Sequence, residues 1–144
     1  ISGNLNEGIL LEGSADLTTV TGNYIGVDAT GTVGLGNWAG IAMRNSSDNN
    51  TIGGAAAGAA NLISGNVDYG INVHAGHGNV IQGNLVGTDL TGTAAIANGA
   101  GGIYLLSASS SNLVGGTAAG EGNLIAYNNG AGPTVTAGSV TCLR

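Results

Sequence analysis

Short triplets with an aliphatic third residue recur along the whole chain. Most begin with Asn, as in residues 61–63 (NLI) and 84–86 (NLV), and their middle position varies. A third position that is always aliphatic beside a variable middle position is the period-two pattern of a strand with one buried side. The middle residues, Leu62 among them, are therefore expected to point outward. The aliphatic third positions are Val20, Ile25, Ile52, Ile63, Ile81, Val86, Val114 and Ile125.

A second recurring segment has the form Gly-Ile-x-(Val, Leu or Met). It occurs at 8–11, 40–43, 70–73 and 102–105, with a looser copy, GPTV, at 132–135. The two aliphatic positions are one residue apart, so both should face the core of a strand. The buried pairs are expected to be Ile41 with Met43, Ile71 with Val73 and Ile103 with Leu105. The leading glycine suits a corner, where the backbone needs unusual dihedral angles.

These segments follow one another in a fixed order, two Asn-led triplets and then a Gly-Ile segment. Three short strands per turn, stacked in parallel, predict an all-β fold, a right-handed parallel β-helix of about four to five turns. Residues 1–17 should supply a partial first turn, and complete turns should cover 18–49, 50–78 and 79–111. The last turn should begin at 112, and the triplet at 141–143 should begin a new strand stacked on 112–114. Residues 1–144 then form a single domain.

Stacking places like residues above like, so the leading asparagines should form two ladders through the helix. The amide of one asparagine can bond to the next along the stack and to corner backbone groups. One ladder is predicted to contain Asn50, Asn79 and Asn112, and the other Asn23, Asn61, Asn84 and Asn123.

The turns alternate in their loops. Turns 18–49 and 79–111 carry long loops at 27–40 and 88–101, whereas the other two turns carry short Ala- and Gly-rich insertions at 55–60 and 117–122. The larger repeat is therefore two turns, which explains why NLISGN at 61–66 returns as NLIAYN 62 residues later.

NLISGN, the IGG at 52–54 and GTDLTGT at 87–93 give the chain its resemblance to the bacterial right-handed parallel β-helix repeat proteins, which include large secreted and surface-attached chains. The resemblance covers essentially the whole chain and implies the fold. That architecture serves lyases, hydrolases, tailspikes and adhesins, so it does not imply one function. No catalytic motif of polygalacturonases or pectate lyases can be matched here residue by residue.

The amino-acid composition limits the kinds of partner that the chain could bind. The chain has no Lys, two Arg and a net charge of −6, with 29 Gly and only 7% charged residues. Nucleic acid requires a basic surface, which this chain lacks. No apolar run approaches the length of a membrane span, so we expect no membrane insertion. The single Cys142 excludes an internal disulfide.

Metal or cofactor chemistry finds little support. His74 and His77 form a His-x-x-His pair that could begin a metal site, but no third ligand follows at a suitable spacing, and a solvated turn is the alternative. The Asp-containing nonapeptide of calcium-binding β-rolls is absent. We expect neither a metal nor a cofactor.

Five side chains are predicted to line a ligand groove between the two long loops. Asp28, Trp38 and Asp89 would form its walls, and Asp68 and Tyr69 of the intervening turn its floor. An aromatic face beside carboxylates suits a sugar. The alternatives are that Asp28 and Asp89 cap their own loops and that Trp38 folds down over its loop.

Two functions remain open from the sequence. The first is a structural or carbohydrate-binding module of a secreted or surface-attached protein, extracellular or at the cell surface, with polysaccharide as the partner. The second is a polysaccharide hydrolase or lyase that uses carboxylates on adjacent turns. No strand edge is capped at either end. We therefore expect a piece of a longer repeat chain, or self-association through open helix ends.

Overall fold

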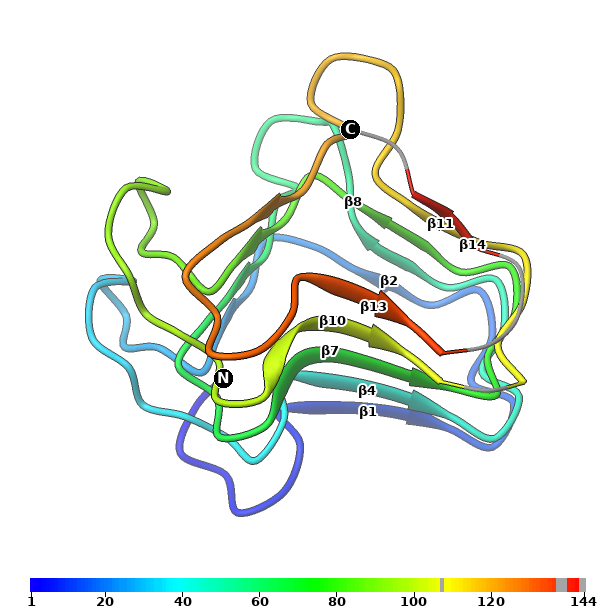
Figure 1. The fold of residues 1–144 in the computed structure, drawn as a ribbon, viewed down its shortest axis with the longest axis horizontal. Helices are drawn as coiled ribbons and strands as arrows, with labels where there is room; N and C mark the ends of the chain where they lie inside the picture. The colour runs from blue at the N-terminus through cyan, green and yellow to red at the C-terminus, as the bar shows by residue number, and fades with distance from the viewer. Residues whose placement is uncertain (107, 137–139, 143–144) are drawn as a thin grey trace.

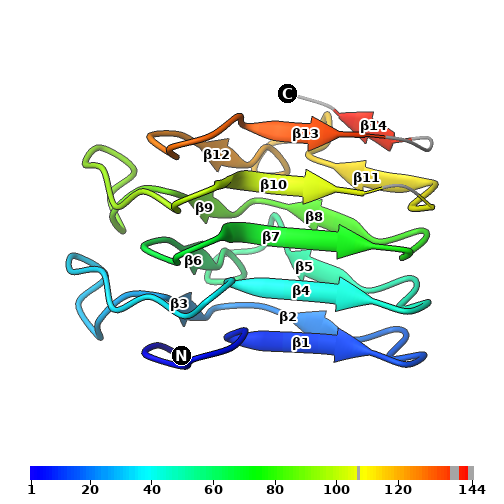
Figure 2. The same cartoon turned by 60° about the horizontal axis from the view of Figure 1, so that its bottom comes forward.

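The computed structural model describes residues 1–106, 108–136 and 140–142, and it shows a parallel β-helix built from three sheets. Every pairing between its named strands is parallel. Figure 1 shows the three sheets around one core, and Figure 2 shows the turns stacked from β1 to β13.

The chain visits the sheets in the same order in each turn. Sheet A contains β1 (Ile9–Glu12), β4 (Ile41–Arg44), β7 (Tyr69–His74), β10 (Gly101–Leu105) and β13 (Pro133–Val135). Sheet B contains β2 (Thr19–Val20), β5 (Thr51–Gly53), β8 (Val80–Gln82), β11 (Asn112–Val114) and β14 (Val140–Cys142). Sheet C contains β3 (Tyr24–Ile25), β6 (Leu62–Ile63), β9 (Leu85–Val86) and β12 (Leu124–Ile125). The predicted fold class is confirmed.

The final triplet was predicted one residue too late. The sequence aligned 141–143 with 112–114, whereas the structure pairs Val140 with Asn112 and Cys142 with Val114. Position 143 lies outside the described residues. The prediction relied on a polar first residue, which is a weak marker in a segment rich in small polar residues, and strand pairing settled the register instead.

Aliphatic side chains stack through the centre of the helix as predicted. Ile71 pairs in register with Ile41 and Ile103, and Val73 pairs with Met43 and Leu105. All six of these side chains are fully buried. The third positions of the triplets contribute the other two walls of the core, and only Ile125, near the last turn, is partly buried. Burial of these columns is the main stabilising contribution to such a fold.

Leu62 departs from the expectation of an exposed middle position, because it is 1% exposed. It does lie on the outer side of sheet C, but the long loops cover it. A Cβ built on Gly31 of the first loop would lie 2.9 Å from a Leu62 methyl group and 3.1 Å from the Cβ of Leu90 in the second loop. In Figure 1 both long loops lie on the sheet C side of the helix. The outer side of sheet C is thus a second, smaller apolar layer.

Both predicted asparagine ladders are present. Within each ladder the Oδ1 atom of an asparagine accepts a hydrogen bond from the backbone N–H of the equivalent residue one turn earlier, as from Asn50 to Asn79 (2.8 Å) and from Asn61 to Asn84 (3.2 Å). The donor to Asn50 is the Thr18 N–H (2.8 Å). Side-chain Nδ2 atoms donate to backbone carbonyls, as from Asn84 to Ile52. The ladders therefore satisfy corner groups that would otherwise be buried without a partner.

A third ladder was missed by the sequence analysis. It runs along the corner between sheets C and A, with the same pattern of bonds, as from Asn66 N–H and Nδ2 to Asn98 Oδ1 (3.1 and 2.9 Å). Its signal was the final Asn of ISGN and IAYN, but the long loops disguise the equivalent positions. Its members are Asn4, Asn37, Asn66, Asn98 and Asn128.

Candidate functional site

Asp28 and Asp89 occupy equivalent places in the two long loops and make equivalent bonds. Asp89 Oδ1 accepts from the backbone N–H groups of Thr93 and Ala94, both at 2.9 Å, and its Oδ2 accepts from the Thr91 hydroxyl at 2.7 Å. Asp28 accepts from the equivalent three groups of its own loop. The structure thus supports the interpretation that each aspartate caps its loop.

These hydrogen bonds hold both carboxylates in the charged form. For Asp89, the bonds from the Ala94 N–H and the Thr91 hydroxyl lower the pKa from 3.8 to about 2. The Thr30 hydroxyl and the Thr32 N–H lower the pKa of Asp28 in the same way. A carboxylate that is ionised at neutral pH and already accepts three hydrogen bonds is poorly placed to donate a proton as a general acid.

The two long loops touch one another instead of standing apart as two walls. The Leu90 N–H donates to the Gly31 carbonyl (3.2 Å), and the Gly65 N–H donates to the Ile96 carbonyl (2.9 Å). The Ile96 side chain lies against the backbone of Gly34 and Gly65. These contacts hold the two loops together over 64–66, so the loops do not form two separate walls above the predicted floor at Asp68 and Tyr69.

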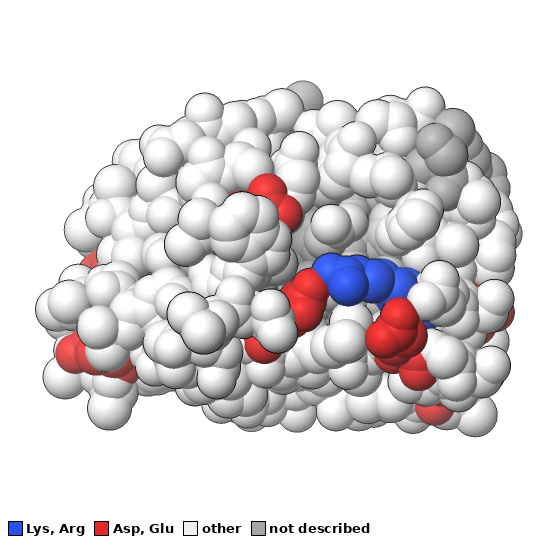
Figure 3. Space-filling model, turned by 90° about the horizontal axis from the view of Figure 1, so that it is seen from below, with Lys and Arg blue, Asp and Glu red and all other residues white. Residues whose placement is uncertain are grey.

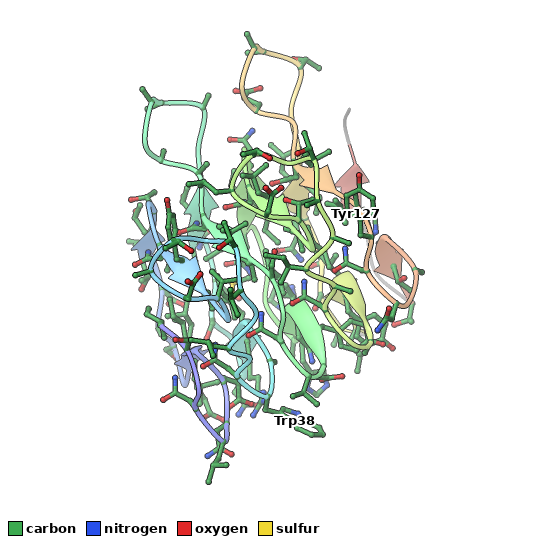
Figure 4. The ribbon with its side chains drawn as sticks, turned by 90° about the vertical axis from the view of Figure 1, so that its left-hand side faces the viewer. Trp38 and Tyr127 are labelled. Atoms are coloured by element: carbon green, nitrogen blue, oxygen red, sulfur yellow. The ribbon has the colours of Figure 1, made fainter. Side chains whose placement is uncertain are left out.

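Trp38 and Asp68 come together at the corner where sheet C leads into sheet A. The Trp38 N–H donates to the Asn6 carbonyl, and the Asp68 N–H donates to the Trp38 carbonyl (2.7 Å). The indole is 52% exposed, and Figure 4 shows it pointing away from the body of the helix. The alternative prediction was that Trp38 folds down over its own loop. Such a position would bury the indole, whereas about half of the residue's surface remains exposed.

Two further apolar side chains are exposed at this corner. Leu5, Trp38 and Val67 each follow an asparagine of the third ladder, and each is more than half exposed. We call Leu5, Trp38, Val67 and Asp68 the Trp38 corner. Exposed apolar residues that gather at one place, beside a carboxylate, are a common feature of binding surfaces.

The outer face of sheet A begins next to this corner with Tyr69. Its ring stacks on that of Tyr104, with centroids 4.6 Å apart and planes inclined by 13°. Burial, followed by Tyr104 and Asp68, raises the pKa of the Tyr69 phenol, so the phenol stays neutral in neutral solution. Beside Tyr104 in register lies Asn72, which is half-buried and whose Oδ1 atom is fully buried without a hydrogen-bond partner.

Arg44 lies along the same face and forms an ion pair with Glu7. Figure 3 shows the arginine with acidic side chains beside it. It is the only Lys or Arg among the residues that the structure describes, and its charge is compensated within the face. Sequence analysis missed Asn72, Tyr104 and this ion pair, although Asn72 and Tyr104 occupy the outward position of the Gly-Ile-x-(Val, Leu or Met) segments.

The two histidines offer little to a metal ion. His74 is exposed at the end of β7, and His77 Nδ1 shares a hydrogen bond with the Ser110 hydroxyl (2.7 Å). Over the described ranges, no three His, Cys, Asp or Glu residues are grouped so that they could hold a metal. Met43, the only methionine, is fully buried in the core.

The three stacked parallel sheets define a β-helix domain. The chain belongs to the NosD family, because the family model described as "Periplasmic copper-binding protein (NosD)" matches residues 1–142. Comparisons with curated proteins and with solved structures gave no match. In the part of the chain that the structure describes, no helix is long and apolar enough to span a membrane.

Proposed function

We propose that this chain is a non-catalytic β-helix module that works outside the cytoplasmic membrane and binds polysaccharide at the Trp38 corner. The observation that carries the proposal is the half-exposed indole of Trp38, which has the exposed Leu5 and Val67 in the adjacent turns. Asp68 is held beside it, because the Asp68 N–H donates to the Trp38 carbonyl. An indole face packs against the apolar face of a sugar ring, and a carboxylate accepts hydrogen bonds from sugar hydroxyls. The periplasmic description of the family supports the location.

Hydrolysis or elimination of a polysaccharide is the second candidate, and the bonding of the carboxylates argues against it. Glycoside hydrolysis requires one protonated and one ionised carboxyl group on either side of the scissile bond. Asp28 and Asp89 are both held ionised by their own loops. Incubation with a polysaccharide panel should therefore release no new reducing ends and no unsaturated products.

Copper is named in the family description, but the donors of this chain do not suit it. Copper sites in proteins use several imidazole or sulfur ligands. Here His77 is hydrogen-bonded to the Ser110 hydroxyl, the methionine is in the core, and no three His, Cys, Asp or Glu side chains are grouped within the described residues. We therefore propose no copper chemistry for the described residues.

The Trp38 side chain is its own probe for glycan binding. Titration with neutral and acidic oligosaccharides should change its fluorescence, and calorimetry should give the affinity. Trp38→Ala should remove most of the binding and Asp68→Asn should weaken it. Tyr127→Ala is a matched control, because Tyr127 is equally exposed (52%) and lies far from Trp38 in Figure 4.

Two results would reject the proposed function. One is the absence of binding to any glycan by the wild-type protein. The other is binding that survives both Trp38→Ala and Asp68→Asn, since the corner would then not be the site.

A further inference from the structure

The stacked pair Tyr69 and Tyr104 is continuous with the Trp38 corner. Tyr69 follows Asp68, whose backbone N–H donates to the Trp38 carbonyl, and the Tyr69 ring reaches across to Tyr104 on the next strand of sheet A. Both rings are partly exposed. Because the two rings already hold one another in place, a ligand that packs against them would restrict little further motion.

Asn72 adds an acceptor to this surface. Its Oδ1 atom is one of two side-chain polar atoms that are buried without a partner in the part of the chain described, and the other, Asn50 Nδ2, belongs to an asparagine ladder inside the helix. Asn72 lies in register with Tyr104 and on the outer face. An unsatisfied buried acceptor is costly. Asn72 itself is partly exposed, so a rotation of its amide on ligand binding would bring Oδ1 to the surface, where a sugar hydroxyl would donate to it and remove that cost.

The charges of the face select against an acidic ligand. Arg44 is engaged by Glu7, and the chain as a whole carries −6. A uronic acid polymer would meet repulsion here without a free cation to offset it. A neutral ligand rich in hydroxyl groups fits both the aromatic pair and the free acceptor.

We propose that the binding surface extends from the Trp38 corner onto the outer face of sheet A and takes a neutral oligosaccharide. Tyr69 and Tyr104 form its second aromatic platform, and Asn72 accepts a hydrogen bond from a sugar hydroxyl. This inference rests on the proposed function, because it extends the same site. Two platforms require a ligand of several sugar units, so long oligosaccharides should bind more tightly than disaccharides.

The experiment compares neutral hexasaccharides (cello-, xylo- and laminari-) with their disaccharides and with an oligogalacturonate hexamer, by calorimetry on the whole chain. Tyr104→Ala and Asn72→Ala should each weaken hexasaccharide binding, Tyr104→Ala by about tenfold. Tyr104→Phe keeps the ring and should bind like the wild type, as should Tyr127→Ala. Tyr104→Ala should also reduce the ratio of disaccharide to hexasaccharide Kd, which a partly unfolded sample would not change.

The possible outcomes separate the two proposals. Loss of binding in Trp38→Ala with no change in Tyr104→Ala and Asn72→Ala overturns the extension and leaves the proposed function standing. Preference for the acidic hexamer overturns the choice of a neutral ligand. No binding of any probe by the wild-type protein overturns both. Weaker hexasaccharide binding in Trp38→Ala, Tyr104→Ala and Asn72→Ala, together with wild-type binding in Tyr104→Phe, supports the proposed function and its extension.

Discussion

The carboxylate of Asp89 fixes the path of the loop between β9 and β10 by accepting hydrogen bonds from two backbone N–H groups and one hydroxyl. Asp28 does the same in the loop between β3 and β4. Asp28 and Asp89, which lie at equivalent places two turns apart, thus have the same structural role. These loops in turn cover Leu62, so each aspartate holds in place a loop that lies over an apolar side chain.

Asp89 should make the stability of the fold depend on acid. Its folded pKa of about 2 lies below its ordinary value of 3.8. A lowered folded pKa stabilises the fold above the unfolded pKa, and that contribution is lost as the pH falls from 3.8 through about 2. In thermal unfolding between pH 6 and pH 2, the difference in Tm between wild type and Asp89→Asn should be largest at pH 6 and shrink in acid.

Asp28→Asn should behave in the same direction, because the pKa of Asp28 is lowered by the same kind of bonds. A Tm difference for Asp89→Asn that stays constant from pH 6 to pH 2 would show that the charged form is not what stabilises the loop.

Replacement of Ile71 by Ala should cost about 2–5 kcal/mol of unfolding free energy, because a fully buried side chain leaves a cavity. Leu62→Ala should also cost clearly more than a surface change, in the lower half of that range, since the covering loops can settle into the space. Leu10→Ala is the control: Leu10 is 42% exposed on the outer face of sheet A, and its loss should cost within about 0.5 kcal/mol. Urea unfolding measures all three, and equal losses for Leu62 and Leu10 would show that the loops do not protect Leu62.

At the scale of elements, the corners set the geometry of the helix. Strands of two to six residues are too short to stand alone, and several of them end at a glycine. Gly26, Gly53 and Gly87 have φ of +85°, +84° and +89°. Gly26 and Gly87 directly follow strands of sheet C, and Gly53 is the last residue of β5 in sheet B. At each of them the backbone of the neighbouring turn leaves no room for a side chain.

Gly87→Ala should therefore be much more damaging than Gly58→Ala. Both glycines have positive φ, but a Cβ on Gly87 would lie 2.3 Å from the Ala126 carbonyl oxygen, whereas a Cβ on Gly58 would meet nothing within 4 Å. Gly58→Ala should cost about 1 kcal/mol from backbone strain alone. Gly87→Ala should cost on the order of 3 kcal/mol or more, because one turn must move away from the next. Similar unfolding free energies for the two variants would contradict this account of the corner.

Asn98 tests the third ladder. Its Oδ1 accepts from the Asn66 N–H and Nδ2, and its Nδ2 donates to the Ile63 carbonyl (3.0 Å). Asn98→Ala should cost about 2–4 kcal/mol, because several buried groups lose their partner together. Asn129→Ala, at an exposed neighbouring position, is the control and should change stability by about 0.5 kcal/mol or less. Equal effects of the two substitutions in urea unfolding would remove the ladder as a stabilising element.

At the scale of the whole molecule, low charge density is the dominant surface property. Only 7% of the residues are charged, and in the described ranges the one cation is paired with Glu7. On such a surface we expect recognition to rely mainly on aromatic faces and hydrogen bonds. This is consistent with the proposal that this member of the NosD family binds glycan.

Glycan binding should accordingly be nearly independent of salt. Charge–charge attraction would be screened as the Debye length falls from about 10 Å at 0.1 M to about 3 Å at 1 M salt. The Kd for a neutral hexasaccharide measured by calorimetry should change by less than about twofold over this range. A tenfold weakening would mean that an ion pair with the ligand carries the affinity, contrary to the neutral surface proposed.

The sequence by itself determined the fold, the order of the strands, the aliphatic columns and two of the three asparagine ladders. It could do so because every turn has the same pattern of buried positions. Ile71 stacks on Ile41 and Ile103, and only one register of the strands places all three side chains in the core. In a stacked repeat each residue contacts the equivalent residue of the next turn, so the sequence pattern also predicts the tertiary contacts. The register of β14 was the exception, because small polar residues mark a register weakly.

Only the tertiary structure decided what happens where the repeat is interrupted. The long loops have no counterpart in the turn between them, so the sequence could not show that they would bond to one another over 64–66 or that Leu62 would be buried beneath them. The same holds for the surface, since Tyr69 and Tyr104 are 35 positions apart in the chain and meet because one strand lies beside the other. Contacts between side chains on the outer face depend on the size and direction of those side chains, which the repeat does not constrain. The physical reason is that side chains exposed to water can adopt many arrangements, whereas the close-packed core permits only one.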